Sequence, residues 1–300
     1  LLSFADAAMY NAKTNRLGVQ LYLPSMTEEV RRKQEMTQQL DEAMDKDEFA
    51  LVFQPQLNVK TNDIVGMEAL LRWQRNGEFV SPAHFISLLE DSGSIVDVGR
   101  WVLKEACEEA KAWAELGRPL RMSVNVSTVQ FERASFLDDV CDGLEATGLD
   151  PTLLELELTE TVFLHEPEKA ISNIEMLRDI GVSISIDDFG TGYSSLAYLK
   201  ALPINRLKID RSFVKDIPNY DDGMIAETIV SLAHNLGMSV IAEGVDTSAQ
   251  LEFLSHRACD EYQGFLFSPP ISSDACRKLL ELDQADETAP KQVNKSVFPP

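Results

Sequence analysis

Short β-type runs alternate with longer helical runs from residue 51 onward, and this alternation restricts the fold more than any other feature of the sequence. The β-type runs occupy residues 51–57, 64–70, 122–126, 153–158, 182–186, 206–209, 239–242 and 262–267. The helical runs occupy residues 95–116, 128–147, 167–180, 223–236 and 247–255. Such repeated strand–helix units are typical of α/β folds built on a parallel sheet.

Eight β-type runs over about 230 residues predict an α/β fold of the (β/α)8 barrel type, and a doubly wound open sheet is the competing arrangement. Asn62 and Asp63 form a short turn signal between the first two runs, which favours a β-hairpin. A hairpin at this place makes one strand antiparallel, so we expect a modified barrel.

The segments on either side of the barrel predict further parts of the chain. Residues 1–23 are too few to bury a core of their own, so we expect them to end a preceding domain. The charged run that follows predicts a linker helix with Thr27 as its N-cap. We expect this linker to begin over residues 24–36, the barrel to occupy 37–282, and the polar, proline-containing segment 283–300 to be disordered.

Composition excludes several classes of function. The 300 residues carry a formal net charge of −22 at pH 7, which argues against a protein that binds nucleic-acid polymers or an anionic membrane surface. The four cysteines lie far apart and form no C-x-x-C pair, so we expect reduced thiols and neither a zinc knot nor a disulfide framework. No apolar run is long enough for a membrane span, so we expect a cytoplasmic location.

Polar side chains end or interrupt most of the β-type runs. They are Glu68, Asn125, Glu157, Glu160, Asp187, Asp188, Lys208, Asp210, Glu243 and Gln263. The carboxyl ends of barrel strands meet at one face, where several carboxylates would repel one another unless a cation lies between them. Oxygen ligands without His or Cys partners select Mg²⁺ or Mn²⁺. Each residue taken alone could cap a helix or face solvent, but their recurrence on successive strands favours a site for one or two such ions.

A glycine-containing loop follows the fifth run at residues 187–195. Two acids stand at its root, and Gly190, Thr191 and Gly192 allow close approach to a ligand or movement over it. The same pattern also suits a plain strand-to-helix connection. It lacks the Gly-Lys-Ser/Thr of a phosphate-binding loop.

These residues lie in motifs that resemble, in order, those of the EAL domain family of cyclic di-GMP phosphodiesterases. The motifs are Phe53-Gln54-Pro55, Glu68-Ala69-Leu70 with Leu71-Arg72-Trp73, Val124-Asn125-Val126-Ser127, Glu157-Leu158-Thr159-Glu160, Asp187-Asp188-Phe189-Gly190-Thr191-Gly192, Lys208-Ile209-Asp210, Ala242-Glu243-Gly244-Val245 and Gln263-Gly264. The resemblance covers residues 37–282. Residues 5–13 resemble the closing helix of a GGDEF (diguanylate cyclase) domain, so residues 1–23 are expected to be its remnant in a longer parent protein with upstream sensory domains.

The resemblance implies a modified TIM-type barrel, a homodimer, and hydrolysis of cyclic di-GMP to linear 5′-pGpG with Mg²⁺ or Mn²⁺, as two ions. It implies that the metal ligands are Glu68, Asn125, Glu157, Asp187 and, for the second ion, Asp188. Lys208 is implied to position the attacking water, and Glu243 to act as base or ligand. The residues implied in substrate binding are Gln54, Gln263 and Arg72, with Arg72 on a phosphate. Glu160 is implied to anchor the loop of Gly190, Thr191 and Gly192 and to contribute to dimerisation.

The complete set of family residues favours an active enzyme. A catalytically silent cyclic di-GMP receptor is the alternative, and a metal-dependent barrel that acts on carboxylated small molecules is a third, weaker hypothesis. One departure is Asp246, where the family often has Glu. Its shorter side chain puts in doubt any hydrogen bond that depends on the longer reach.

Overall fold

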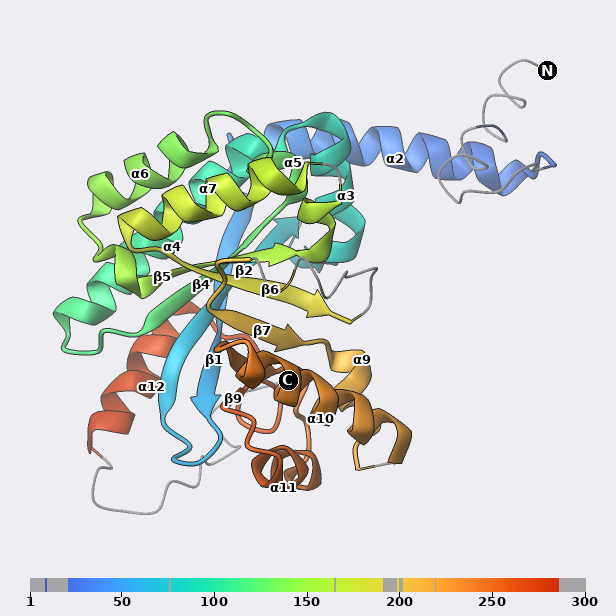
Figure 1. Cartoon of the computed structure of the whole chain (residues 1–300). Helices are drawn as coiled ribbons and strands as arrows, with labels where there is room; N and C mark the ends of the chain where they lie inside the picture. The colour runs from blue at the N-terminus through green and yellow to red at the C-terminus, as the bar shows by residue number, and fades with distance from the viewer. Residues whose placement is uncertain are drawn as a thin grey trace. The chain divides into compact units, whose positions relative to one another are not determined.

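The structure is a computed structural model that describes residues 9, 21–75, 77–164, 166–190, 199, 202–218 and 220–285 (Figure 1). The chain divides into two compact units. The first consists of Leu1–Ala50 and Arg72–Ile95, and the second of Leu51–Leu71 and Val96–Pro300. Within the described ranges, no helix combines the length and the apolar character that crossing a bilayer requires.

Eight strands of the second unit close into a barrel. They are β1 (Phe49–Asn58), β2 (Ile64–Arg75), β4 (Arg121–Val126), β5 (Leu154–Thr159), β6 (Ser183–Phe189), β7 (Arg206–Ile209), β8 (Ser239–Ala242) and β9 (Glu261–Tyr262). Their order is β1-β9-β8-β7-β6-β5-β4-β2, and a further β1–β2 pairing completes the circle. Each ladder from β2 through β4 to β9 is parallel, whereas β1 pairs antiparallel with β9. The predicted modified barrel is confirmed, and the open sheet is wrong.

Helices surround the barrel strands (Figure 1). They are α4 (Ile95–Glu115), α5 (Thr128–Phe131), α6 (Phe136–Thr147), α7 (Pro167–Ile180), α9 (Arg211–Val214), α10 (Tyr220–Asn235), α11 (Ser248–His256) and α12 (Ser273–Ala285), with the short 3₁₀ turns η1 (Pro151–Leu153) and η2 (Glu160–Phe163). α7 packs on β6, and α10 packs on β7 and β8. Phe53 of β1 meets Trp113 of α4 edge to face at 5.2 Å, so aromatic packing fills the layer between strand and helix.

The interior of the barrel is polar, because most of its strands carry two polar residues that are two positions apart. Successive side chains of a strand alternate between faces, so residues at i and i+2 share the inner face. The pairs are Gln54 and Gln56, Ser123 and Asn125, Glu155 and Glu157, Ser185 and Asp187, Arg206 and Lys208, and Glu261 and Gln263. Apolar residues between them, such as Leu156 and Leu207, are fully buried. The structure therefore has an apolar layer outside the strands and two polar layers inside them.

The first unit contains α2 (Pro24–Ala43), α3 (Pro82–Ser92) and β3 (Glu78–Val80), which pairs antiparallel with the end of β2. Trp73 is fully buried there, 6.5 Å from the ring of Phe49 and 5.8 Å from that of Phe85. Its indole Nε1 donates a hydrogen bond to Glu48 Oε2 at 2.9 Å. The indole of Trp73 is therefore held both by ring packing and by a hydrogen bond.

Several boundaries differ from the sequence-based expectation. α2 begins at Pro24, so Thr27 lies inside the helix and is not its N-cap. Proline suits a first helical position because its fixed φ is already helical. The predicted helix 128–147 is broken into α5 and α6, and α12 continues to Ala285, beyond the expected end of the barrel at residue 282. β3, α3 and α12 were not predicted.

The last predicted strand, 262–267, is wrong in extent because β9 ends at Tyr262. The chain turns after Gln263, where Gly264 lies against the backbone of Val245. A Cβ atom at Gly264 would stand 2.2 Å from Val245 O and 2.3 Å from Val245 N. The backbone of Val245 also exchanges hydrogen bonds with Gln263 and Leu266, each at 3.0 Å. This close approach, which only glycine permits, ends the strand.

We predict that Gly264→Ala lowers the free energy of unfolding by about 1–3 kcal/mol, because the backbone of Val245 must move to admit the methyl group. Gly143→Ala in α6 is the matched control. A Cβ there meets nothing within 4 Å, so the change should be neutral or stabilise the helix by up to about 1 kcal/mol. Urea unfolding followed by circular dichroism measures both, and equal midpoints for the two variants would contradict the role given to Gly264.

Candidate functional site

The ammonium group of Lys208 is buried among carboxylates from several strands, and we call this group of residues the upper layer. Its Nζ atom is 2.5 Å from Glu157 Oε2, 2.8 Å from Glu243 Oε1, 3.2 Å from Asp187 Oδ1 and 3.8 Å from Glu68 Oε1. These carboxylates come from four different strand positions, on β5, after β8, on β6 and on β2. The barrel therefore brings together residues that are up to 175 positions apart in the sequence (243 − 68).

Side-chain amides hold the carboxylate of Glu68 from two sides. Asn125 Nδ2 donates to Glu68 Oε1 at 2.7 Å, and Gln263 Nε2 donates to Glu68 Oε2 at 2.5 Å. Gln263 Nε2 also donates to Gln54 Oε1 at 2.9 Å, and Gln54 Nε2 donates to the carbonyl of Ser268 at 3.1 Å. Both oxygens of Glu68 are thus oriented by neutral donors, which fix the group and leave its charge in place.

Asp187, Asp188 and Glu243 form an acidic cluster at the strand ends. One carboxylate oxygen of each lies within 4.8 Å of the others. Consecutive residues of a regular strand point to opposite faces, yet Asp187 and Asp188 share this cluster. The register of β6 against β7 shifts between Ile186 and Phe189, and Asp188 has a φ of 52°. This bulge, with its left-handed residue, turns the second acid towards the first.

Burial and mutual repulsion change the protonation of these groups. Burial, together with Asp187, raises the pKa of Glu243 to about 8 even though Lys208 opposes the change. Burial also raises the pKa of Glu157 well above its usual range. For Asp188, burial and then the charge of Asp187 raise the pKa to about 6. The protein alone does not supply enough positive charge to keep every carboxylate ionised.

The pKa of Lys208 moves the other way from what burial dictates. Burial would lower it, but the charges of Asp187, Glu157, Glu243 and Glu68 raise it well above the usual lysine value. Lys208 therefore stays an ammonium, and four carboxylates share it. When all are ionised, the group has three more negative charges than positive ones.

Unpartnered oxygen atoms show that the residues fit a divalent cation. Glu157 Oε1 and Gln263 Oε1 are buried without a hydrogen-bond partner among the described residues. Buried polar atoms are normally paired, so each such oxygen points to a missing partner. Carboxylate and amide oxygens beside an excess of negative charge are the ligands that Mg²⁺ and Mn²⁺ prefer. The assignment of individual metal ligands stays a prediction.

The remaining predicted site residues fall in three places. Glu160 Oε1 accepts a hydrogen bond from the Gly190 backbone at 2.8 Å, which ties η2 to the end of β6. Thr191 and Gly192 lie outside the described residues. Arg72 lies on β2, in the first unit of the chain, and its role on a phosphate stays a prediction.

Asp246, the residue that departs from the family pattern, still makes connections. Its Oδ2 is 3.1 Å from Arg211 Nη2, and its Oδ1 accepts a hydrogen bond from the Phe265 backbone at 3.1 Å. The shorter side chain therefore joins segments that follow β7, β8 and β9.

Sequence reasoning missed the lower polar layer, whose residues are Gln56, Arg121, Ser123, Glu155, Arg206 and Glu261. Each is buried or nearly so. Gln56, on the antiparallel strand β1, lies two positions after the predicted site residue Gln54, and each of the others lies two or four positions before a predicted site residue. The signal that could have found them is the i, i+2 spacing itself, because a polar residue two positions before an inward-facing one also faces inward.

Comparison with known proteins decides the family. A family model described as EAL domain matches residues 37–270, more than half of the chain. The chain belongs to the EAL domain family. The EAL resemblance of the motifs is confirmed, and the matched residues lie within the predicted barrel. The match does not reach residues 1–23, and of these only residue 9 and residues 21–23 are described, so the GGDEF remnant, like the parent protein and the homodimer, stays a prediction.

Two named bacterial proteins are similar to this chain. This chain is 41% identical over 285 residues to the signaling protein YkoW of Bacillus subtilis. The matched region covers 93% of this chain and 35% of YkoW. The chain is 38% identical over 294 residues to the cyclic di-GMP phosphodiesterase NbdA of Pseudomonas aeruginosa, covering 97% of this chain and 38% of NbdA. The chain thus spans little more than a third of the length of these relatives.

A solved EAL structure carries a nucleotide. The PaMucR phosphodiesterase in complex with c-di-GMP is 39% identical to this chain, with a TM-score of 0.78. The match covers 81% of this chain and 99% of that one. The bound cyclic di-GMP belongs to that structure.

We predict that, with chelator present, the free energy of unfolding falls as the pH rises from about 5 to about 8. Glu243 binds its proton more tightly when folded, because its pKa is raised to about 8 there. Its contribution is complete below the unfolded pKa of about 4.3 and is lost as the pH passes the folded value. Urea unfolding at several pH values measures this trend.

The same experiment with Mg²⁺ in place of chelator provides the contrast. A cation that takes the place of the proton should raise the urea midpoint more at high pH than at low pH. A stability that does not change with pH in chelator, or a metal effect that is equal at all pH values, would contradict the charge balance described for the site.

Proposed function

We propose that this chain hydrolyses one phosphodiester bond of cyclic di-GMP and releases linear 5′-pGpG, with Mg²⁺ or Mn²⁺ as cofactor. The observation that carries the proposal is the excess of buried and half-buried carboxylates around Lys208 on an EAL barrel. The similarity to the phosphodiesterase NbdA and to the nucleotide-bound PaMucR structure supports the same substrate.

The residues proposed to hold the cations are Glu68, Asn125, Glu157, Asp187 and Asp188, with Glu243 as a further ligand or as a base. Divalent ions supply a nucleophilic water of lowered pKa and stabilise the charge on phosphoryl oxygens. They also reverse the local field, which lets a strongly acidic protein accept an anionic dinucleotide.

The protein contributes orientation and charge. Asn125 and Gln263 fix the carboxylate of Glu68 through their amide groups, so its oxygens keep one direction. Lys208 presents a permanently charged ammonium that is held by Glu157 and Glu243, and it is proposed to hold the attacking water in line. Preorganised charges of this kind stabilise a transition state without a reorganisation cost.

We predict that Glu68→Ala abolishes turnover and leaves the barrel folded. The change removes one proposed ligand, and it also lowers repulsion among the carboxylates, so the urea midpoint need not fall. Glu145→Gln on α6, where the side chain is exposed, is the control and should keep full activity. Chromatography of the nucleotide products, with Mg²⁺ in one reaction and chelator in another, measures both variants.

The same assay tests the proposed function itself. Linear pGpG that forms with metal and not with chelator supports the phosphodiesterase. Binding of cyclic di-GMP without any turnover would instead support the silent receptor, and retained activity in Glu68→Ala would contradict the metal ligand set. A failure of cyclic di-GMP to bind would leave the barrel acting on a different substrate.

We predict that Lys208→Ala lowers kcat by at least about a hundredfold and changes the nucleotide Kd much less. The ammonium is buried among the carboxylates, so its loss affects the reacting centre. Steady-state kinetics and a separate binding titration without turnover measure the two quantities. Loss of nucleotide binding with a folded protein would contradict the role in positioning water.

A further inference from the structure

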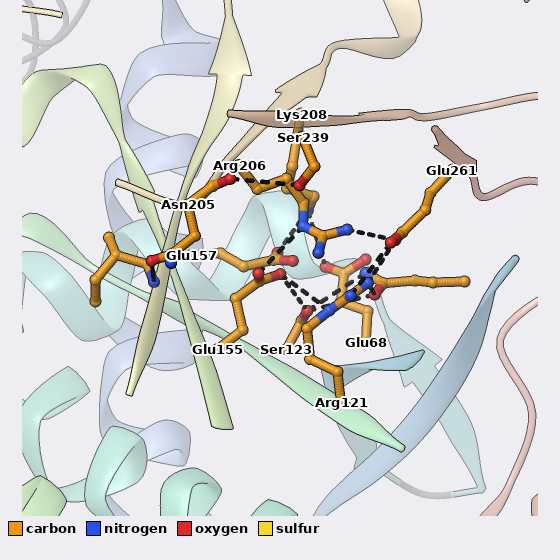
Figure 2. Close-up of polar contacts among 12 residues, drawn as sticks. Glu68, Arg121, Ser123, Glu155, Glu157, Asn205, Arg206, Lys208, Ser239 and Glu261 are labelled. Carbon is orange, nitrogen blue, oxygen red and sulfur yellow. Dashed lines mark hydrogen bonds and ion pairs between the residues drawn. The ribbon is translucent and has the colours of Figure 1, made fainter. Parts of the chain in front are cut away.

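A second network of charged side chains fills the barrel beside the carboxylates around Lys208 (Figure 2). It consists of Arg121, Glu155, Arg206 and Glu261, and we call it the floor network. Arg121 Nη2 is 2.6 Å from Glu261 Oε2, and Arg121 Nε is 3.4 Å from Glu155 Oε1. Arg206 Nε is 3.2 Å from Glu155 Oε2, and Arg206 Nη1 also pairs with Glu261. Each arginine thus contacts both glutamates.

The floor network joins strands that are not neighbours in the sheet. Arg206 on β7 reaches Glu155 on β5 and Glu261 on β9, and in each case one strand lies between. Arg121 on β4 reaches Glu261 across the barrel, because β4 and β9 are separated on both sides. Backbone hydrogen bonds connect only adjacent strands, so these side chains provide connections that the sheet itself lacks.

The site residues stand directly above these connections on the same strands. Glu155 precedes Glu157 by two residues, Arg206 precedes Lys208 by two, and Glu261 precedes Gln263 by two. β7 has four residues and β9 has two. Few backbone hydrogen bonds therefore fix the position of these strands along the barrel axis. The floor network ties these two short strands, β7 and β9, to the longer strands β4 and β5.

The charges of the floor network balance, unlike those around Lys208. Two guanidinium groups face two carboxylates, and the arginines lower the pKa of Glu261 although burial opposes the change. A balanced, buried ion network adds little to stability compared with apolar packing of equal volume. Its value to this protein must then lie in what it holds in place.

We propose that the floor network is a positioning layer that sets the distances among Lys208, Glu157 and the other groups of the upper layer. The inference rests on the proposed function, because it assigns Arg206, Glu155, Arg121 and Glu261 to the support of the same site. None of the four is proposed to touch substrate or metal. They act through the strands that carry the reacting groups.

Arg206→Met tests the proposal, because it removes both connections from β7 and keeps much of the side-chain length. We expect kcat to fall at least about tenfold with a smaller change in KM, since a displacement of about 1 Å among reacting groups costs more than that. The affinity for Mg²⁺, measured by calorimetry without substrate, should also fall at least about tenfold.

Arg100→Met is the matched control. Arg100 on α4 pairs with the buried Asp139 on α6, 2.9 Å from Nε to Oδ1, outside the barrel interior. Its loss also leaves a buried carboxylate without its arginine, although Arg100 itself is half exposed, and the urea midpoints of the two variants give the general destabilisation of each. Activity and Mg²⁺ affinity of this variant should stay within about twofold of the parent chain.

Two further measurements apply if Arg206→Met does not fold or if the parent chain shows no turnover. Glu261→Gln is nearly isosteric and should change kcat and Mg²⁺ affinity in the same direction if Arg206→Met does not fold. Amide hydrogen exchange in β7 and β9 needs neither metal nor turnover, and it should be faster in Arg206→Met than in Arg100→Met.

The outcomes separate the two proposals. A parent chain that hydrolyses no cyclic di-GMP overturns the proposed function, and the floor network is then judged by Mg²⁺ affinity and hydrogen exchange. Folded floor variants that keep kcat, Mg²⁺ affinity and exchange rates within about twofold of the parent would overturn the positioning role. An equal loss in Arg100→Met would also overturn it, because general destabilisation would explain both.

Discussion

One buried ammonium group shared by four carboxylates, two of them buried and two half-buried, is the interaction on which the rest of this structure depends. Lys208 is fully enclosed, and each neighbouring carboxylate comes from a different strand position. Charges of one sign in a poorly solvated space repel strongly, so the arrangement persists only where protons or cations supply what Lys208 does not. Burial and the neighbouring acids raise the pKa of Glu243 to about 8 and that of Asp188 to about 6, so protons can supply part of this balance.

The barrel divides its polar interior into a balanced part and an unbalanced part. The floor network pairs two arginines with two glutamates, whereas the layer above it has more acids than bases. Both layers come from the same pattern of alternate residues on the same strands. An inward-facing surface that is polar on most strands also explains why the apolar residues gather between the strands and the helices outside them.

Much of the fold and of the site could be predicted because each depended on local pattern. Alternating runs gave the barrel, and a two-residue turn signal at Asn62 and Asp63 gave the antiparallel strand. Residues such as Glu157 and Lys208 stood out because a charge in an apolar strand demands a partner. In the structure these two side chains partner each other, with Lys208 Nζ 2.5 Å from Glu157 Oε2.

The features that sequence missed depend on contacts between distant segments. Nothing local shows that Gly264 must lie against Val245, so the apolar residues after Tyr262 were interpreted as strand. Arg206 was hidden because it opens its predicted run, where a charge usually marks a strand end in solvent. Glu155 was hidden because it lies inside its run, before Glu157, which was interpreted as the end of that run. Only the folded barrel shows that these two side chains face each other.

The pattern of ion pairs in the floor network has a consequence for how the barrel folds. Three of its four ion pairs join strands that are not neighbours, namely β5 with β7, β7 with β9, and β4 with β9, and the fourth joins the neighbours β4 and β5. A sheet that has not yet closed would hold Arg121 and Glu261 apart, because β4 and β9 meet only across the closed barrel, and this loss adds a cost to the partly assembled states. Such penalties deepen the gap between the native barrel and its incomplete forms, so closure is expected to be a single cooperative event.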